Sequence, residues 1–179
     1  MKNKYKGMTV NERLYSNGLL EKYDNAVKGR DVATIISILE EVELKEKSII
    51  PILENLRLYG EMYEYKRKNF IDNTQKYFQF LETEFEFSKP THLSYKQANG
   101  TIISDKMAYK NTSLNKKVVI SNNYHPYDYG FEISIIDVES ETEEMLSYVL
   151  KEKQDIKQEY LKEQGEVLKK YCKQIKWTK

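Results

Sequence analysis

Residues 93–104 read LSYKQANGTIIS, and this stretch decides the fold class of the chain. Asn99-Gly100 is the strongest short hairpin signal in the sequence, because both residues tolerate positive φ. It predicts a strand over Leu93–Ala98 that turns directly into a second strand over Thr101–Ser104. Strands joined this tightly run antiparallel, so the sequence indicates a sheet built from hairpins.

Further strands are predicted downstream of this hairpin. Lys106–Lys110 is followed by a turn-rich segment, and Lys117–Ser121 is β-branched and apolar at its centre. Phe131–Ile135 alternates apolar and polar residues, which is typical of a strand with one buried face. The short connections favour an antiparallel meander of three to five strands over residues 92–138.

Helical patterns precede the sheet. One helix is expected from the capping box Thr9-Val10-Asn11-Glu12 to Gly29, and a second is capped by Asp31. A third starts at Ser48, which would place Pro51 in the first turn, where its missing amide has no intrahelical partner. A fourth pattern runs from Phe70 to Phe85 and ends at Ser88-Lys89-Pro90.

A long helix is predicted after the sheet, from residue 142 to residue 175. Its start is the second capping box, Ser140-Glu141-Thr142-Glu143, and glutamates at 139, 141, 143 and 144 would complement the helix dipole. A straight helix of this length would span roughly 50 Å at 1.5 Å per residue. Because that exceeds a small domain, we expect a break near Lys151–Asp155.

The predicted fold class is therefore α+β, with N-terminal helices, a small antiparallel meander sheet and a long C-terminal helix or helix pair. Leu58-Tyr59-Gly60 is the best candidate boundary. We predict a three-helix N-terminal module over residues 1–60 and an α+β domain over residues 61–179.

Composition and charge limit the possible partners. The chain has 179 residues, of which 40% are hydrophobic and 32% charged, as in globular proteins. The 29 basic and 28 acidic side chains leave a net charge of +1, and no segment forms a basic arm, so nucleic acid is not a favoured partner. No stretch resembles a signal peptide or approaches the roughly 18 apolar residues of a membrane span. We therefore expect a cytoplasmic protein without a membrane partner.

Residue types that usually carry chemistry are scarce. The chain has two histidines, His92 and His125, and one cysteine, Cys172, and none of its seven glycines forms a phosphate-cradling pattern. A metal site or a histidine-based nucleophilic enzyme is hard to assemble from this inventory, so we expect no metal, no cofactor and no catalysis. Cys172 is interpreted as a small buried hydrophobe. An enzyme using carboxylates and tyrosines remains an alternative, which would need a deep pocket gathering distant acidic groups.

The densest polar and aromatic cluster is the predicted loop Asn122–Gly130, in a chain with fifteen tyrosines. Surface loops often carry binding residues, and tyrosine gives a large contact area at low entropic cost. The candidate partner-binding residues are Tyr124, His125, Tyr127, Asp128 and Tyr129. The alternative is that these tyrosines pack back on the sheet. His125 beside Asp128 suggests an acid–base pair, but nothing nearby supplies a nucleophile.

Lys66-Arg67-Lys68 is the only basic triplet. Aromatic residues flank it, an arrangement found in some proteins that bind single-stranded nucleic acid. Three charges are too few to indicate such a partner, and we interpret the triplet as a solvated linker.

Two stretches resemble known families. Met8–Tyr15, with Gly18-Leu19-Leu20 and Ile49–Leu53, resembles a helical N-terminal module of small uncharacterised bacterial proteins. Phe80–Phe87, followed by tyrosine-rich strands and the segment Leu168–Cys172, is similar to bacterial immunity proteins of contact-dependent or polymorphic toxin systems. Those proteins need no catalytic apparatus, because they neutralise a toxin by binding it.

The resemblance implies a non-catalytic protein that binds a cognate toxin domain in a stoichiometric complex. Immunity proteins of this kind act through aromatic anchors and charge complementarity. The alternative is a protein–protein interaction adaptor, with the N-terminal three-helix module as its docking unit.

Overall fold

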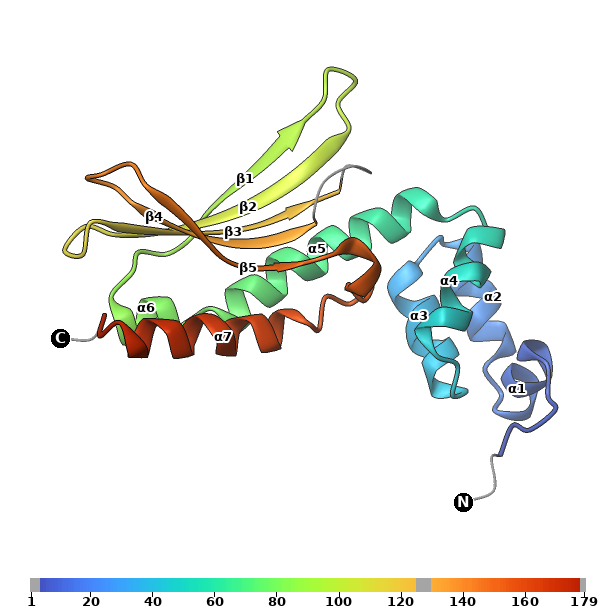
Figure 1. The fold of residues 1–179 in the computed structure, drawn as a ribbon. Coiled ribbons are helices and arrows are strands. Elements are labelled where there is room, and N and C mark those ends of the chain that lie inside the picture. The colour runs from blue at the N-terminus through green and yellow to red at the C-terminus, as the bar shows by residue number, and fades with distance from the viewer. Residues whose placement is uncertain (1–3, 125–129, 178–179) are drawn as a thin grey trace. The chain divides into compact units, whose positions relative to one another are not determined.

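The computed structural model describes residues 4–124 and 130–177 and has the predicted α+β class (Figure 1). The chain divides into two compact units, residues 1–66 and residues 67–179. Helix α5 (Tyr59–Tyr77) contains the point of division, whereas the sequence suggested a boundary at Leu58-Tyr59-Gly60.

The first unit is helical. Its helices before α5 are α1 (Val10–Ser16), α2 (Leu20–Lys28), α3 (Val32–Glu41) and α4 (Glu46–Asn55). The capping box at Thr9 is confirmed, since the Thr9 amide donates to Glu12 Oε2 at 2.7 Å and the Glu12 amide donates to Thr9 Oγ1 at 3.3 Å. The prediction of one helix from Thr9 to Gly29 was wrong, because Gly18 takes a φ of +67° and separates α1 from α2.

Two further details of this unit differ from the expectation. Helix α4 begins at Glu46, so Pro51 lies inside the helix and not in its first turn. Asp31 caps α3 as predicted, by accepting from the Thr34 amide at 3.1 Å. The unit has a core of its own, whose fully buried apolar residues include Leu14, Ile35, Ile36, Leu39, Val42, Ile49 and Leu53.

The second unit contains a five-stranded antiparallel sheet in the order β1-β2-β3-β4-β5. The strands are β1 (Thr91–Lys96), β2 (Ile102–Asn111), β3 (Lys116–Asn123), β4 (Phe131–Asp137) and β5 (Glu143–Val149). The helices are the rest of α5, α6 (Phe80–Phe85), the 3-10 turn η1 (Lys151–Lys153) and α7 (Leu161–Gln174). Each strand pairs with its neighbours in the chain, so the antiparallel meander is confirmed. Four of its strands lie in the predicted range 92–138, because the two strands expected over Thr101–Ser104 and Lys106–Lys110 are one strand, β2, and the fifth strand was not predicted.

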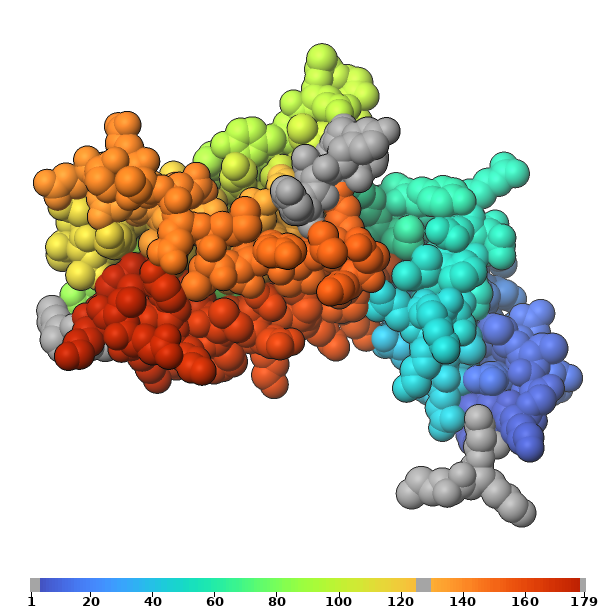
Figure 2. All heavy atoms as spheres, viewed as in Figure 1, coloured from blue at the N-terminus to red at the C-terminus, as the bar shows by residue number. Residues whose placement is uncertain are grey.

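Helices α5, α6 and α7 cover one face of the sheet, which we call the inner face (Figure 1). The core between them is formed by the residues Phe70, Phe78, Phe80, Leu81, Phe85, Phe87, Met107, Tyr109, Val118, Ile120, Phe131, Ile133, Ile135, Leu161, Leu168, Cys172 and Trp177. Side chains of β5 and α7 lie side by side along one side of this unit (Figure 2), where Tyr171 donates to Glu144 at 2.9 Å. No helix among the described residues lies on the opposite face, which we call the outer face.

The hairpin at Asn99-Gly100 is confirmed. Gly100 takes a φ of +85° and donates its amide to the Gln97 carbonyl at 2.9 Å. The register shifts between Tyr95 and Lys96, which gives a bulge beside the turn. The extra residue of this bulge is Ile103 of β2, and the connection from Lys96 to Ile102 is longer than the two-residue turn expected from the sequence.

The helix predicted from residue 142 was wrong at its start, because Glu143–Val149 is strand β5. Ser140 does not cap a helix; instead Asp137 Oδ1 accepts from the amides of Glu139 at 3.0 Å and Ser140 at 2.9 Å, which closes the turn between β4 and β5. The glutamates at 139, 141, 143 and 144 therefore do not interact with a helix dipole. The C-terminal helix α7 starts only at Leu161.

Candidate functional site

The predicted binding loop is only partly described by the structure. Tyr124 follows the end of β3 and donates its amide to the Ile103 carbonyl at 2.8 Å. His125, Tyr127, Asp128 and Tyr129 lie outside the described residues. The residues that flank the loop, Asn123 of β3 and Phe131 of β4, lie at the same end of the sheet as the β1–β2 turn, and Asn122 and Asn123, expected in the loop, belong to β3.

Buried amide side chains anchor the chain beside this loop. Asn122 donates to Gln158 Oε1 at 2.9 Å, and Gln154 donates to Asn122 Oδ1 at 3.2 Å. Gly130 has a φ of +100°, and a Cβ there would lie 2.6 Å from Gln154 Nε2. Only glycine fits this approach, so the network fixes the start of β4 against the segment that follows β5.

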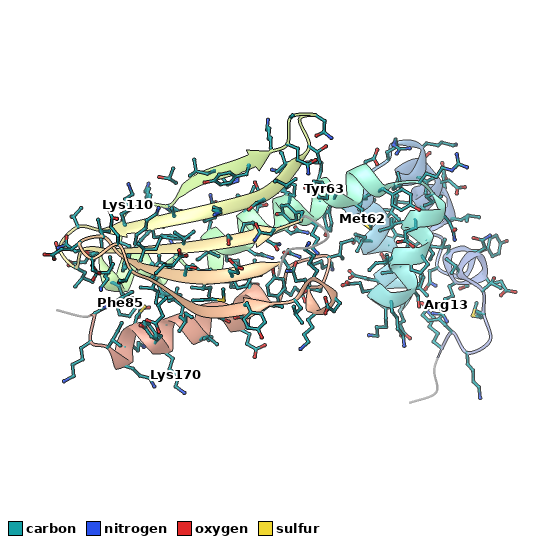
Figure 3. All side chains as sticks on the ribbon, turned by 45° about the horizontal axis from the view of Figure 1, so that its top comes forward. Arg13, Met62, Tyr63, Phe85, Lys110 and Lys170 are labelled. Atoms are coloured by element: carbon teal, nitrogen blue, oxygen red, sulfur yellow. The ribbon has the colours of Figure 1, made fainter. Side chains whose placement is uncertain are left out.

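No described helix covers the outer face of the sheet (Figure 3). The strand registers give the rows that cross it. One row consists of Leu93, Lys106, Ser121, Glu132 and Tyr148. The next row consists of Thr91, Ala108, Val119, Ser134 and Met145. Small residues therefore occupy much of the middle of the face, and larger apolar side chains stand on its two edge strands.

Exposure follows the same pattern. Leu93 and Tyr95 on β1 are each 48% exposed, and Met145 and Tyr148 on β5 are 52% and 57% exposed. Toward the middle, the small side chains Ser104, Ala108, Ser121 and Ser134 are buried. On the outer face, the exposed large apolar side chains therefore lie on the two edge strands, and the small residues of the middle strands are buried.

Charges on the outer face are separated by strand. Lys106, Lys110 and Lys117 project from β2 and β3, whereas Glu132 and Glu143 project from β4 and β5. Lys110 lies directly opposite Lys117 in the register, and neither forms an ion pair with any described residue. Like charges directly opposite each other on a sheet are destabilising. The pair Lys110 and Lys117 therefore does not contribute to the stability of the fold.

A second polar group lies on the inner side of β1, and we call it the clamp: Arg67, His92, Ser94 and Asp105. Arg67 donates from Nε to Asp105 Oδ2 at 2.7 Å and from Nη2 to Oδ1 at 3.0 Å. Ser94 donates to Asp105 Oδ1 at 2.6 Å, and His92 Nε2 lies 2.9 Å from the same oxygen. The Asp105 side chain is fully buried and that of Arg67 is 9% exposed.

The prediction that the Lys66-Arg67-Lys68 triplet is a solvated linker was wrong for Arg67. This side chain lies on the face of α5 that packs against the sheet, where Asp105 neutralises it. Lys68 does behave as expected, since it is exposed and pairs with Asp72 one turn along the helix.

The clamp contains serine, histidine and aspartate, but it lacks the geometry of a catalytic triad. In a triad, one ring nitrogen of histidine contacts the aspartate and the other contacts the serine. Here His92 Nε2 is the atom near both Asp105 (2.9 Å) and Ser94 (3.4 Å), and Ser94 donates its own proton to Asp105. The arrangement holds strand β1 and offers no activated nucleophile.

The electrostatics of the clamp are those of a satisfied buried carboxylate. Burial raises the pKa of Asp105, but hydrogen bonds from Arg67, Ser94 and His92 outweigh it and lower the pKa below its ordinary value. Asp105 is therefore ionised at neutral pH and held by opposite charge, as in a structural ion pair.

Two hollows with acidic groups lie at the other end of the sheet. One of about 490 Å³ is lined by residues that include Lys110, Lys117, Ile136 and Val138. Another of about 340 Å³ lies beside Tyr171 and Trp177, and its carboxylates, Asp137, Glu143 and Glu144, all come from one short stretch of the chain. Neither gathers acidic groups from distant parts of the sequence, which the enzyme alternative requires.

Among the residues that the structure describes, no group of three or more His, Cys, Asp or Glu side chains is arranged to hold a metal ion. No helix within the described ranges is both long enough and apolar enough to cross a bilayer. In comparisons with known proteins, no family model, curated protein or solved structure matches the chain.

Proposed function

We propose that this protein is a non-catalytic immunity or antitoxin-like protein, which neutralises a cognate bacterial toxin by binding it through the outer face of the sheet. The observation that carries the proposal is the outer face itself: a broad, helix-free surface with apolar rims on its two edge strands, β1 and β5. Aromatic and large apolar side chains of this kind are the usual anchors of protein–protein interfaces.

The charge pattern supports a protein as the partner. Lys106, Lys110 and Lys117 on one half of the face oppose Glu132 and Glu143 on the other, so a partner with the mirrored arrangement would match both halves. Such complementarity steers association and selects one partner over others. It also accounts for the Lys110–Lys117 pair, whose mutual repulsion a carboxylate of the partner would relieve.

The chemistry of the clamp is consistent with binding rather than catalysis. The two side chains that could take part in a reaction, His92 and Ser94, both bind Asp105 and thereby hold strand β1 in place. An inhibitor that occupies its target needs such rigidity, because a preordered surface loses less entropy on association.

The test compares binding of the full chain with that of an outer-face variant. The tagged protein is expressed in its native host, the stoichiometric partner is identified, and the purified partner is titrated against wild type and a Tyr95→Ala/Tyr148→Ala variant. We expect the double substitution to weaken binding by roughly 10–100-fold, as for interface anchors. Tyr15→Ala is the matched control, because Tyr15 is an exposed tyrosine of the helical unit.

Neutralisation provides the second readout. Expression of the captured partner alone should arrest growth, and co-expression of the wild-type protein should restore it, whereas the double variant should not. A partner that is harmless on its own contradicts the toxin assignment, and equal affinity of wild type and double variant contradicts the outer-face assignment.

The loop after β3 has its own test. Alanine at Tyr124, Tyr127 and Asp128 together should weaken binding of the same partner while the circular dichroism spectrum and melting temperature stay unchanged. Unaltered affinity would remove these residues from the interface.

The adaptor alternative is favoured by one observation, the separate core of residues 1–66. If this unit is the docking element, then a fragment of residues 1–66 captures the partner alone and Tyr15→Ala weakens binding. Binding by residues 67–179 alone would instead support the outer face.

A further inference from the structure

Strand β1 is an edge strand with unusual exposure. All six of its residues, Thr91–Lys96, are exposed, although five of them are the uncharged sequence Thr-His-Leu-Ser-Tyr. Edge strands present unpaired backbone groups, and proteins usually protect them with charges, bulges or a covering element. No described segment covers this edge.

The other edge strand of the sheet, β5, carries two features that protect an edge from pairing with another strand. Strand β5 carries Glu143 and Glu144, and its register shifts between the partners of Ile133 and Ser134, which makes Leu146 a bulge. Strand β1 is regular from Thr91 to Tyr95 and has no charge in that range. One edge is thus closed to further strands, and the other is open.

The pairing with β2 shows which backbone groups of β1 face the open edge. The Lys110 carbonyl accepts from the Ser88 amide at 2.7 Å, on the β1 side of β2, whereas the Ile103 carbonyl accepts from Tyr124 on the β3 side. Backbone groups alternate sides along an antiparallel strand. Even-numbered residues 104–108 therefore bond to their β1 partners Thr91, Leu93 and Tyr95, which leaves His92 and Ser94 facing outward.

The clamp fixes these two residues in place. The side chains of His92 and Ser94 both bind Asp105, at 2.9 Å and 2.6 Å, and Asp105 is held by Arg67 from α5. The residues whose amides and carbonyls are open to a new strand are thus the residues that are tied to the body of the protein. This edge is preordered for pairing.

We propose that this open edge binds β1 of a second copy of the chain, in an antiparallel pair centred on Leu93. The sequence of the edge is complementary to itself in this register. His92 lies opposite Ser94 of the partner copy and exchanges two backbone hydrogen bonds with it, and the symmetric pair exchanges two more. On the outer face, Leu93 of one copy lies opposite Leu93 of the other, and Tyr95 of each copy lies opposite Thr91 of the other.

The same register explains where the pairing stops. Pro90 precedes the strand and has no amide to donate, and the residue opposite it in this register is Lys96, the last residue of β1. No two like charges face each other between these limits. The closed pair is a two-fold dimer with one continuous ten-stranded sheet, twice the five strands of each copy.

The dimer rests on the backbone edge of β1, and its self-association is measured without the toxin, so its failure and the failure of the proposed toxin binding are distinguishable. Sedimentation equilibrium of the full chain, from roughly 1 μM to 1 mM, covers the range in which small interfaces associate. The mass should rise from 21.3 kDa toward twice that value with concentration. A mass that stays at 21.3 kDa throughout overturns the proposal.

Substitutions at Leu93 test the register, because only the proposed register places Leu93 of one copy opposite Leu93 of the other. Leu93→Lys and Leu93→Glu should each weaken self-association at least tenfold, while an equimolar mixture should associate at least as well as wild type. Leu93 is 48% exposed and its backbone bonds to β2, so both variants keep the fold. Equal association of either variant alone and of the mixture would show that Leu93 does not lie at the axis.

Cysteine cross-linking tests the geometry directly. Directly opposed residues of a non-hydrogen-bonded pair have Cα atoms about 4.5 Å apart, within the range of a disulfide. Leu93→Cys should form a disulfide-linked dimer under mild oxidation, faster than Met145→Cys, the matched control on the β5 edge with similar exposure. The native Cys172 is buried and does not interfere. Cross-linking of both variants at the same rate would indicate collision only and contradict the proposed dimer.

Discussion

Arg67 and Asp105 form a two-point ion pair between helix α5 and strand β2, with Nε–Oδ2 at 2.7 Å and Nη2–Oδ1 at 3.0 Å. The two residues are 38 positions apart in the sequence, and both side chains are almost fully removed from water. This pair connects the helical layer to the part of the sheet that carries β1, so its loss affects stability and the open edge together.

Asp105→Asn should lower the free energy of unfolding by about 3–5 kcal/mol, because Arg67 would remain buried without its counter-charge. Chemical denaturation measures the change. Lys68→Ala is the matched control on α5, and we expect a change within about 0.5 kcal/mol for this exposed pair with Asp72. A loss at Asp105 no larger than the control would mean that the ion pair adds nothing.

Acid should destabilise the protein partly through the same carboxylate. The pKa of Asp105 is lower in the folded protein than in the unfolded chain, where it is about 3.9. The stabilisation is therefore fully present above the unfolded value and is lost as the pH falls below it toward the folded pKa. Wild type should lose stability over this range more steeply than Asp105→Asn, and parallel curves from pH 6 to pH 2, measured about one unit apart, would contradict the assignment.

Gly165 allows α7 to approach the end of α5. A Cβ at this position would lie 2.8 Å from the Tyr77 carbonyl oxygen, which belongs to the backbone and cannot move aside. Gly165→Ala should therefore destabilise the protein by roughly 1–3 kcal/mol, although alanine favours helices. Thermal unfolding measures the loss. Glu166→Ala, at the exposed neighbouring position of α7, should leave the melting temperature nearly unchanged.

Cys172 should be inert toward thiol reagents in the folded protein. The side chain is fully buried in the core, and burial raises the pKa of its thiol to about 12. Because the thiolate is the reactive form, labelling at pH 8 should be slow in buffer and fast in denaturant. Rapid labelling of the native protein would show that α7 detaches from the sheet.

Local signals predicted most of the sheet. Asn99-Gly100 marks a turn by its backbone preferences alone, and Phe131–Ile135 alternates because its two faces meet different environments. These patterns depend on near neighbours in the sequence, and the strands they indicate are present.

Strand β5 was mistaken for a helix for a physical reason. The bulge at Leu146 inserts one residue and shifts the alternation, so that Met145, Leu146, Val149 and Leu150 acquire a spacing that resembles a helix. The capping-box pattern at Ser140 strengthened this interpretation. A bulge interrupts the alternation of inward and outward side chains, so this strand is recognised only from its pairing with β4.

The clamp illustrates the limit of sequence reasoning at the candidate site. The predicted strands Thr101–Ser104 and Lys106–Lys110 left Asp105 between them, so its pairing with Ser94 is seen only in the structure. Arg67 reaches Asp105 through the packing of α5 on the sheet, which no local pattern indicates. The outer face likewise becomes visible only when the helices are assigned to the opposite side.

The strict chain order of the strands has a consequence for biosynthesis. As the chain leaves the ribosome, each strand meets a partner that has just emerged, so the sheet can assemble without waiting for distant segments. Its apolar inner face has α5 and α6 from the start, but Leu161, Leu168 and Cys172 arrive last, on α7. The interval between the emergence of β5 and of α7 is therefore when the nascent chain depends most on chaperones, and a chain that ends before α7 would be released with that core open.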